Sequence, residues 1–174
     1  MKIDGLNSGG SSLSFLNSTV SSASGTSTIR FQNDAVNNTI TNCNLYGSAQ
    51  TTFGSASATV IFGGNSTVTG NDNNVISNCN IGPAGGNLPT CAVYFSGTTS
   101  SSSLYNNNDT VRNCNIYDYF FSSGHTVGIM VSSGNTATSV LNNKFYQSAS
   151  RIYTSSNLDH YAIYINNTSG DNFR

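Results

Sequence analysis

The sequence is poor in charged residues. Asp, Lys and Arg together make up 7% of its 174 residues, against about 25% in an ordinary soluble domain. Glutamate is absent, so all seven acidic side chains are aspartates. Six basic residues bring the net charge to −1, which provides no electrostatic basis for binding nucleic acid or an anionic membrane surface. General acid–base catalysis would also have few side chains to draw on.

Long apolar runs are missing as well. No stretch of about 18 apolar residues could span a bilayer, and no basic segment followed by an apolar one opens the chain as a signal peptide would. The first residues, Met1–Gly5, resemble the inside of a strand and turn, and Asp171–Arg174 resembles the start of another repeat. We therefore expect residues 1–174 to form one domain, truncated at both ends and cut from a longer protein.

Helix-forming residues are scarce, and Ser, Thr, Asn and Gly dominate instead. Low charge can favour disorder, but disordered chains also lack aromatic and β-branched residues. This chain has nine Tyr and nine Phe, with Ile and Val at regular intervals. Because these residue types favour strands, the composition predicts an almost all-β protein.

One sequence motif recurs along the chain. It contains Asn-Cys-Asn followed by Leu or Ile, and the residues that mark its copies are Cys43, Cys79, Cys114 and, in a degenerate copy, Asn143. These residues are 36, 35 and 29 positions apart. A period in this range is typical of a solenoid, in which each unit stacks on the previous one.

A second series, made of apolar segments, lies between the copies of this motif. Its members are Thr28–Phe31, Thr59–Phe62, Ala92–Phe95, Gly128–Val131 and Ala162–Ile165. Their last residues are 31, 33, 36 and 34 positions apart. Each unit thus contains a strand formed by the apolar segment, a polar turn, a strand formed by the Asn-rich motif, a tight bend and a third short strand.

Alternation along these strands predicts which side chains point inward. The expected interior columns are Ile29 and Phe31 with their equivalents; Ile40, Ile76, Val111 and Val140; and Leu45, Ile81, Ile116 and Phe145, joined by Cys43, Cys79 and Cys114. Three short strands per turn, stacked in parallel about 4.8 Å apart, form a coil with a narrow apolar interior. The sequence therefore predicts a single-chain parallel β-helix of about five coils, right-handed by the general rule for parallel crossovers.

Asparagines mark the bend between the second and third strands of each unit. They are Asn42, Asn78, Asn113 and Asn142. Asparagine tolerates the left-handed backbone conformation that a sharp bend needs. We also expect the side-chain amides of this column to hydrogen-bond to one another from coil to coil, as in the asparagine ladders of stacked β structures.

The Asn-rich motif, whose sequence at residues 37–45 is NNTITNCNL, resembles the repeats of right-handed parallel β-helix proteins of the pectate-lyase-like superfamily. The segments IDGLNSGGSSL, GTSTIRFQNDAVNNTITNCNLYGS, NCNIGPAGGNLP and IYINNTSGDNF are similar to β-helix regions of large secreted Bacteroidetes surface proteins. This resemblance covers nearly the whole chain. It implies a secreted or cell-surface protein and no particular activity.

Polysaccharide lyases and hydrolases of this fold need clustered or paired carboxylates. The aspartates here are Asp4, Asp34, Asp72, Asp109, Asp118, Asp159 and Asp171. None recurs as a pair two residues apart, and we interpret Asp34, Asp72 and Asp109 as caps of their own turns. We therefore predict no catalytic residue, no metal site and no cofactor.

The two histidines do not complete a catalytic motif. Ser123-Gly124-His125 resembles the Gly-His of polygalacturonases, but the Asp-Asp pair of those enzymes is missing. Asp159 and His160 are adjacent in a strand, so their side chains should face opposite ways, and no motif supplies a nucleophile for a triad. We expect His125 to be a loop residue beside the start of a strand.

The cysteines are spaced too evenly for a zinc site, whose ligands come in close pairs. Stacked Cys43, Cys79 and Cys114 would also lie slightly too far apart for a relaxed disulfide. We expect free, buried thiols that act as small apolar side chains. A bridge between Cys79 and Cys91 remains an alternative in an oxidising compartment.

The outward positions of the second series form the best candidate surface. They are Arg30, Ile61, Tyr94, Met130 and Tyr164, which we call the exterior stripe. Exposed rows of this kind bind sugars by ring stacking or form interfaces. The alternative is that the long Gly/Ser loops fold over the stripe.

Two functions follow from these observations. The first is a non-catalytic structural or adhesive module of a secreted or cell-surface protein, with neighbouring domains of the same longer chain as its partners. The alternative is a carbohydrate-binding or polysaccharide-degrading β-helix, in which Tyr94 and Tyr164 form the platform for an extracellular polysaccharide.

Overall fold

The structure, a computed structural model, describes residues 1–7, 10–11 and 13–174. Three parallel sheets of five strands each build the fold. The first sheet contains β1 (Lys2–Asp4), β6 (Thr39–Thr41), β9 (Val75–Ser77), β13 (Thr110–Arg112) and β17 (Ser139–Leu141). The second contains β4 (Leu13–Asn17), β7 (Cys43–Gly47), β10 (Asn80–Pro83), β14 (Asn115–Tyr117) and β18 (Lys144–Tyr146). The third contains β5 (Ile29–Phe31), β8 (Val60–Phe62), β11 (Cys91–Phe95), β15 (Thr126–Val131) and β19 (His160–Ile165).

Smaller elements lie in the connections. The strands β2 (Leu6–Asn7) and β3 (Gly10–Ser11) pair with each other in antiparallel fashion, and β12 (Asn106–Asn107) pairs with β16 (Asn135–Thr136) in parallel. A short 3₁₀ helix, η1, spans Ser102–Leu104. None of these elements interrupts the three main sheets.

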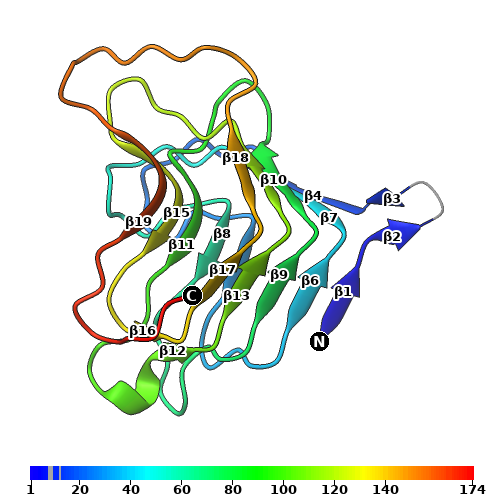
Figure 1. Cartoon of the computed structure of the whole chain (residues 1–174), viewed down its shortest axis with the longest axis vertical. Helices are drawn as coiled ribbons and strands as arrows, with labels where there is room; N and C mark the ends of the chain where they lie inside the picture. Colours follow the sequence, from blue (N-terminus) through cyan, green and yellow to red (C-terminus); the bar gives the residue numbers. More distant parts are fainter. Residues whose placement is uncertain (8–9, 12) are drawn as a thin grey trace.

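The chain visits the first, second and third sheets in turn and then repeats the circuit. Each main strand pairs with the strand of the same sheet in the preceding and following circuit, as in the order β1-β6-β9-β13-β17. Figure 1 shows β8, β11, β15 and β19 side by side, with the loops between the second and third sheets gathered beyond one end of these strands. The prediction of a parallel β-solenoid of about five coils is confirmed.

In-register stacking fills the interior. Ile3, Ile40, Ile76, Val111 and Val140 occupy equivalent positions of the first sheet. In the third sheet the rings of Phe31 and Phe62 stack at 4.8 Å between centroids, and those of Phe62 and Phe95 at 4.3 Å. These columns belong to one continuous cluster, so the predicted inward faces are confirmed.

The predicted bend asparagines adopt the left-handed conformation. Their φ angles are 56° at Asn42, 52° at Asn78, 55° at Asn113 and 53° at Asn142. The expectation that this column carries an amide ladder is wrong. Asn42 donates instead to Asp4 at 2.9 Å, and Asn78 reaches Thr41 Oγ1 at 3.5 Å. The amides of Asn42 and Asn78 are thus directed to partners outside the asparagine column.

Amide ladders run along other columns of the coil. One passes from Asn80 Nδ2 to Asn44 Oδ1 and from Asn115 Nδ2 to Asn80 Oδ1, both at 2.8 Å. A second, buried in the turns between the third and first sheets, passes from Asn71 to Asn106 at 3.1 Å and from Asn106 to Asn135 at 3.0 Å. Since buried polar groups must be hydrogen-bonded, these ladders tie each coil to the next.

The aspartates of the turns also bond between coils, which corrects their interpretation as caps of their own turns. Asp34 accepts backbone N–H groups of residues 67–70, one coil further on. Asp72 accepts from the backbone of Asn107 at 2.9 Å. Asp109 accepts from the backbone and side chain of Asn74 at 2.8 and 3.1 Å. In a stacked coil the turn of the neighbouring coil is as close as the residue's own turn.

All four cysteines are free and buried. Cys79 belongs to the interior cluster, whereas Cys91 belongs to a second cluster on the outer side of the third sheet. The alternative of a Cys79–Cys91 bridge therefore does not fit, because the sheet separates the two sulfur atoms. Burial raises the pKa of the Cys91 thiol, which disfavours its reactive thiolate form.

Candidate functional site

The exterior stripe exists as a column in the third sheet. Strand register places Arg30 beside Ile61, Ile61 beside Tyr94, Tyr94 beside Met130 and Met130 beside Tyr164. All five positions alternate with the inward residues of their strands. The sequence therefore identified the members of this face correctly.

The middle of the stripe is covered by residues 51–58, the loop that follows β7. Ile61, Tyr94 and Met130 are only 2%, 4% and 4% exposed. The Tyr94 hydroxyl donates to the carbonyl oxygen of Gly54 in this loop at 3.1 Å, and the ring of Phe53 meets that of Tyr164 edge-on at 5.0 Å. The structure thus agrees with the alternative in which a loop folds over the stripe.

The two ends of the stripe remain open. At one end Tyr164 is half-buried and its ring lies 5.0 Å from that of Tyr161. At the other end Arg30 is exposed and borders a groove of about 320 Å³. Its lining residues are Ser24, Gly25, Arg30, Gln32, Ala56, Ile61, Gly63, Gly64, Asn65 and Ser96.

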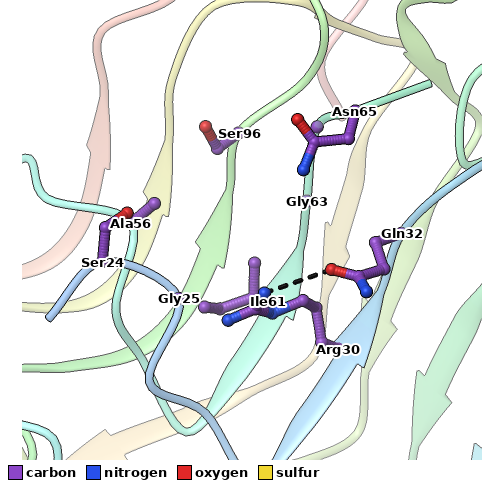
Figure 2. A pocket seen from close by; sticks show the side chains of 10 residues that line it. Ser24, Gly25, Arg30, Gln32, Ala56, Ile61, Gly63, Asn65 and Ser96 are labelled. Atoms are coloured by element: carbon purple, nitrogen blue, oxygen red, sulfur yellow. Dashed lines mark hydrogen bonds between the residues drawn. The ribbon is translucent and has the colours of Figure 1, made fainter. Parts of the chain in front are cut away.

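Figure 2 shows how this groove, which we call the Arg30 groove, is built. The Arg30 side chain runs beside Ile61 toward Gly25, Gln32 and Asn65 lie on one side, and Ser24 and Ala56 lie on the other. Arg30 and Gln32 are two residues apart at β5, so both side chains leave the same face of the strand. The lining residues come from β5 and β8, from the loops that lead into these two strands, and from the residues that follow β5, β8 and β11.

Two contacts position the guanidinium of Arg30. Its Nη1 donates to Gln32 Oε1 at 3.1 Å. Its Nη2 occupies the place that a Cβ atom would take at Gly25, whose φ of 88° also favours glycine. Because Gly25 has no side chain, the guanidinium of Arg30 can lie directly against this loop.

A second polar cluster surrounds His160, beside a smaller cleft of about 270 Å³ next to Phe120. The amide of Gln147 is oriented by Arg151, whose Nε donates to Gln147 Oε1 at 3.1 Å. Gln147 Nε2 then faces His160 Nε2 at 3.2 Å and must donate to it. The His160 proton accordingly lies on Nδ1, which donates to Thr126 Oγ1 at 2.7 Å.

The chain of hydrogen bonds continues beyond Thr126. The Thr126 hydroxyl donates to the Tyr153 oxygen at 2.6 Å, and Tyr153 donates to the carbonyl oxygen of Asp159 at 2.8 Å. The ring of Tyr119 stacks on His160 at 4.7 Å with an interplanar angle of 10°. Burial lowers the pKa of His160, in keeping with a neutral imidazole that has every polar atom bonded.

His125 precedes β15, as expected of a loop residue beside a strand start. Its Nδ1 accepts the backbone N–H of Asp159 at 3.0 Å and so carries no proton, although Asp159 Oδ2 also lies 3.3 Å from it. That carboxylate accepts the Tyr161 hydroxyl at 2.9 Å. Asp159 and His160 face different partners.

Asp118, which lies near the His160 cluster, also has its carboxylate oxygens bonded. Asp118 accepts from the backbone and hydroxyl of Ser148 at 2.7 and 2.6 Å and pairs with Arg151 at 2.8 Å. Burial opposes ionisation, but the bonds from Ser148 and Arg151 outweigh it and lower the pKa of Asp118. In the described part of the chain, no group of three His, Cys or Asp side chains is placed to hold a metal ion.

Sequence reasoning named Arg30 and Ile61 but missed the other residues of the Arg30 groove. Gln32 could have been found, because it lies two residues from Arg30 on the same outward face. Ser24, Gly25, Asn65 and Ser96 lie in Gly/Ser/Asn-rich connections with no distinctive pattern. Only folding brings these connections together.

Within the described residues no helix is long and apolar enough to cross a membrane. Comparison of the chain with protein-family models, with curated proteins and with solved structures finds no match.

Proposed function

We propose that this chain is a non-catalytic structural module of a secreted or cell-surface protein. The proposal rests on one observation: many polar side chains of the chain form hydrogen bonds between neighbouring coils. Columns such as Asn44–Asn80–Asn115 and Asn71–Asn106–Asn135 bond one coil to the next, and Asp34, Asp72 and Asp109 do the same. These groups stiffen the coil and are not free to act on a substrate.

The location outside the cell is supported by the resemblance of the Asn-rich repeats to β-helix regions of secreted Bacteroidetes surface proteins. The pectate-lyase-like assignment has the same basis. A low-charge coil with buried, neutral ladders suits a stiff spacer between other parts of a longer chain.

Carbohydrate binding is the second candidate, and the half-buried rings of Tyr161 and Tyr164 favour it. Rings that remain partly open at the end of a sheet face can stack on a sugar. Tyr94 is a poor platform because the 51–58 loop covers it.

A polysaccharide pull-down separates the two candidates. Under the structural proposal, the wild-type protein and the Tyr164→Ala variant are retained equally weakly on a panel of insoluble polysaccharides. Tyr146→Ala is the matched control, since Tyr146 is an exposed ring of the second sheet. Retention that Tyr164→Ala abolishes and Tyr146→Ala preserves would overturn the structural proposal in favour of carbohydrate binding.

A further inference from the structure

The Arg30 groove has an unbalanced positive charge. Arg30 is the single charged residue among the ten described residues that line it. Among the described residues, ion pairs join Lys2 to Asp4 and Arg151 to Asp118, and Asp159 lies beside His125, so Arg30 takes part in none of these contacts. Its partner is the neutral amide of Gln32.

The guanidinium is nevertheless held in place. The bond to Gln32 commits one of its N–H groups, and Gly25 leaves the space in which Nη2 lies. A guanidinium has five N–H donors in a fixed fork, so most of them remain available for a ligand. A positioned arginine loses less side-chain entropy on binding than a freely mobile one would.

Neutral polar groups surround this cation. Within the described part of the chain, no hydrogen bond engages the side chains of Ser24, Asn65 or Ser96 or the NH₂ group of Gln32. Figure 2 shows these side chains arranged around the groove. Hydroxyl and amide groups can donate to oxygen atoms and accept from hydroxyl groups, whereas Ala56 supplies a small apolar surface.

We propose that the Arg30 groove binds a small hydroxyl-bearing carboxylate. One cation matches one negative charge, and the planar fork of Arg30 matches the two oxygens of a carboxylate. The free hydroxyl and amide groups of the lining, which include those of Ser24, Asn65 and Ser96, offer partners for the hydroxyl of the ligand on either side of the groove. A volume of about 320 Å³ lies at the lower end of the range typical of ligand pockets, about 300 to 1,000 Å³.

The test is an NMR titration of the ¹⁵N-labelled protein at constant ionic strength. Glycolate is the hydroxy-carboxylate probe, acetate lacks the hydroxyl, acetamide lacks the charge, and inorganic phosphate is the competing anion. We expect saturable shifts of the Arg30 Nε–H signal and of the Gly63, Gly64 and Ser96 amides with glycolate. Acetate should bind more weakly and acetamide not at all.

The variant Arg30→Gln removes the charge and keeps a polar side chain. It should weaken glycolate binding by about tenfold or more, because a hydrogen bond to a charged group generally contributes that much. Arg112→Gln is the matched control, since Arg112 is another exposed strand arginine outside the groove. Gly25→Ala keeps the charge but displaces the guanidinium, and it should weaken binding as well.

Thermal unfolding of each variant verifies that it is folded. Equal shifts with acetamide and glycolate, or equal binding by wild type and Arg30→Gln, would overturn the proposal. Tighter binding of phosphate than of glycolate would overturn the assignment to a carboxylate. Equal affinity for acetate and glycolate would overturn the role of the neutral side chains.

Discussion

Asp109 occupies a column that the preceding coils fill with Asn38 and Asn74. Its side chain is 1% exposed, and Oδ1 accepts both bonds from Asn74. Oδ2 has no partner among the described residues. Burial raises the pKa of Asp109 well above its usual value of 3.8, because no positive charge compensates the carboxylate.

Asp109→Asn should therefore stabilise the protein at neutral and alkaline pH, by about 1–3 kcal/mol or more, because it removes a buried negative charge that has no cationic partner. The raised pKa means that the folded state holds its proton to higher pH than the unfolded state. Wild-type stability should thus fall as pH rises from about 3.8 toward the folded pKa, and the variant should lack this loss. Urea unfolding from pH 4 to pH 9 measures the difference.

The exposed carboxylate of Asp171 provides the control for this experiment. Asp171→Asn should retain the wild-type decrease of stability with pH. If Asp109→Asn retained it too, Asp109 would not be the titrating group.

A second prediction concerns the bend residue Asn113, which is exposed and has a φ of 55°. Asn113→Ala should be less stable than Asn113→Gly by about 1 kcal/mol, because the left-handed conformation is strained for alanine and free for glycine. Denaturant unfolding of the two variants provides the measurement. An alanine variant at least as stable as the glycine variant would contradict the left-handed bend.

At the scale of elements, strands and loops differ in how well the sequence predicted them. The apolar alternation located strands of all three sheets, since an inward face repeats every second residue. The loop of residues 51–58 gave no such signal, and its docking onto Tyr94 and the β19 residue Tyr164 was one of two open alternatives. Loop placement depends on contacts between coils that the local sequence does not encode.

The 147–159 loop is tied to β15 and β19 through His160, and this contact should depend on pH. A proton on His160 Nε2 would face the NH₂ group of Gln147, so protonation breaks that bond. Because burial lowers the folded pKa of His160, the unfolded state binds its proton first, and stability should decrease as pH falls below about 6.5. The protection factors of amides in the 147–159 loop, in which the intrinsic pH dependence of exchange is divided out, should decrease over the same range.

The groups that face His160 are Tyr119, Phe120, Thr126 and Gln147, with Tyr153 and Arg151 bonded behind them. Long-range ¹H–¹⁵N NMR spectra should show the proton on Nδ1 at pH 8. His160→Phe should remove the acid-dependent decrease of protection in this loop. A proton on Nε2 in those spectra would contradict the hydrogen-bond directions.

At the scale of the whole molecule, the outermost strands lack a partner strand on one side within the described part of the chain. These strands are β1, β4 and β5 at one end of the stack and β18 and β19 at the other, where β17 is bonded through Val140 to Arg174. Ile165 in β19 is 53% exposed at this edge. Unpaired edges with apolar side chains favour pairing with another chain.

We predict that this chain associates end to end as its concentration rises. Light scattering should show the increase in mass, and Ile165→Lys should reduce it by placing a charge on the edge strand. Ile152→Lys is the control, because Ile152 is 83% exposed but lies in a loop outside the strands. A monomer at high concentration, or equal reduction by both variants, would count against association through the strand edges.

The sequence by itself determined the solenoid, the positions of its main strands and the residues that point inward, because a repeat of about 35 residues and an alternation of two are properties of the chain alone. It also identified the members of the exterior stripe. Only the tertiary structure decided that a loop covers Ile61, Tyr94 and Met130 while Arg30 stays open beside Gly25 and Gln32. The reason is physical: stacking repeats the same contacts in every coil, whereas each loop docks once, through contacts with residues of other coils.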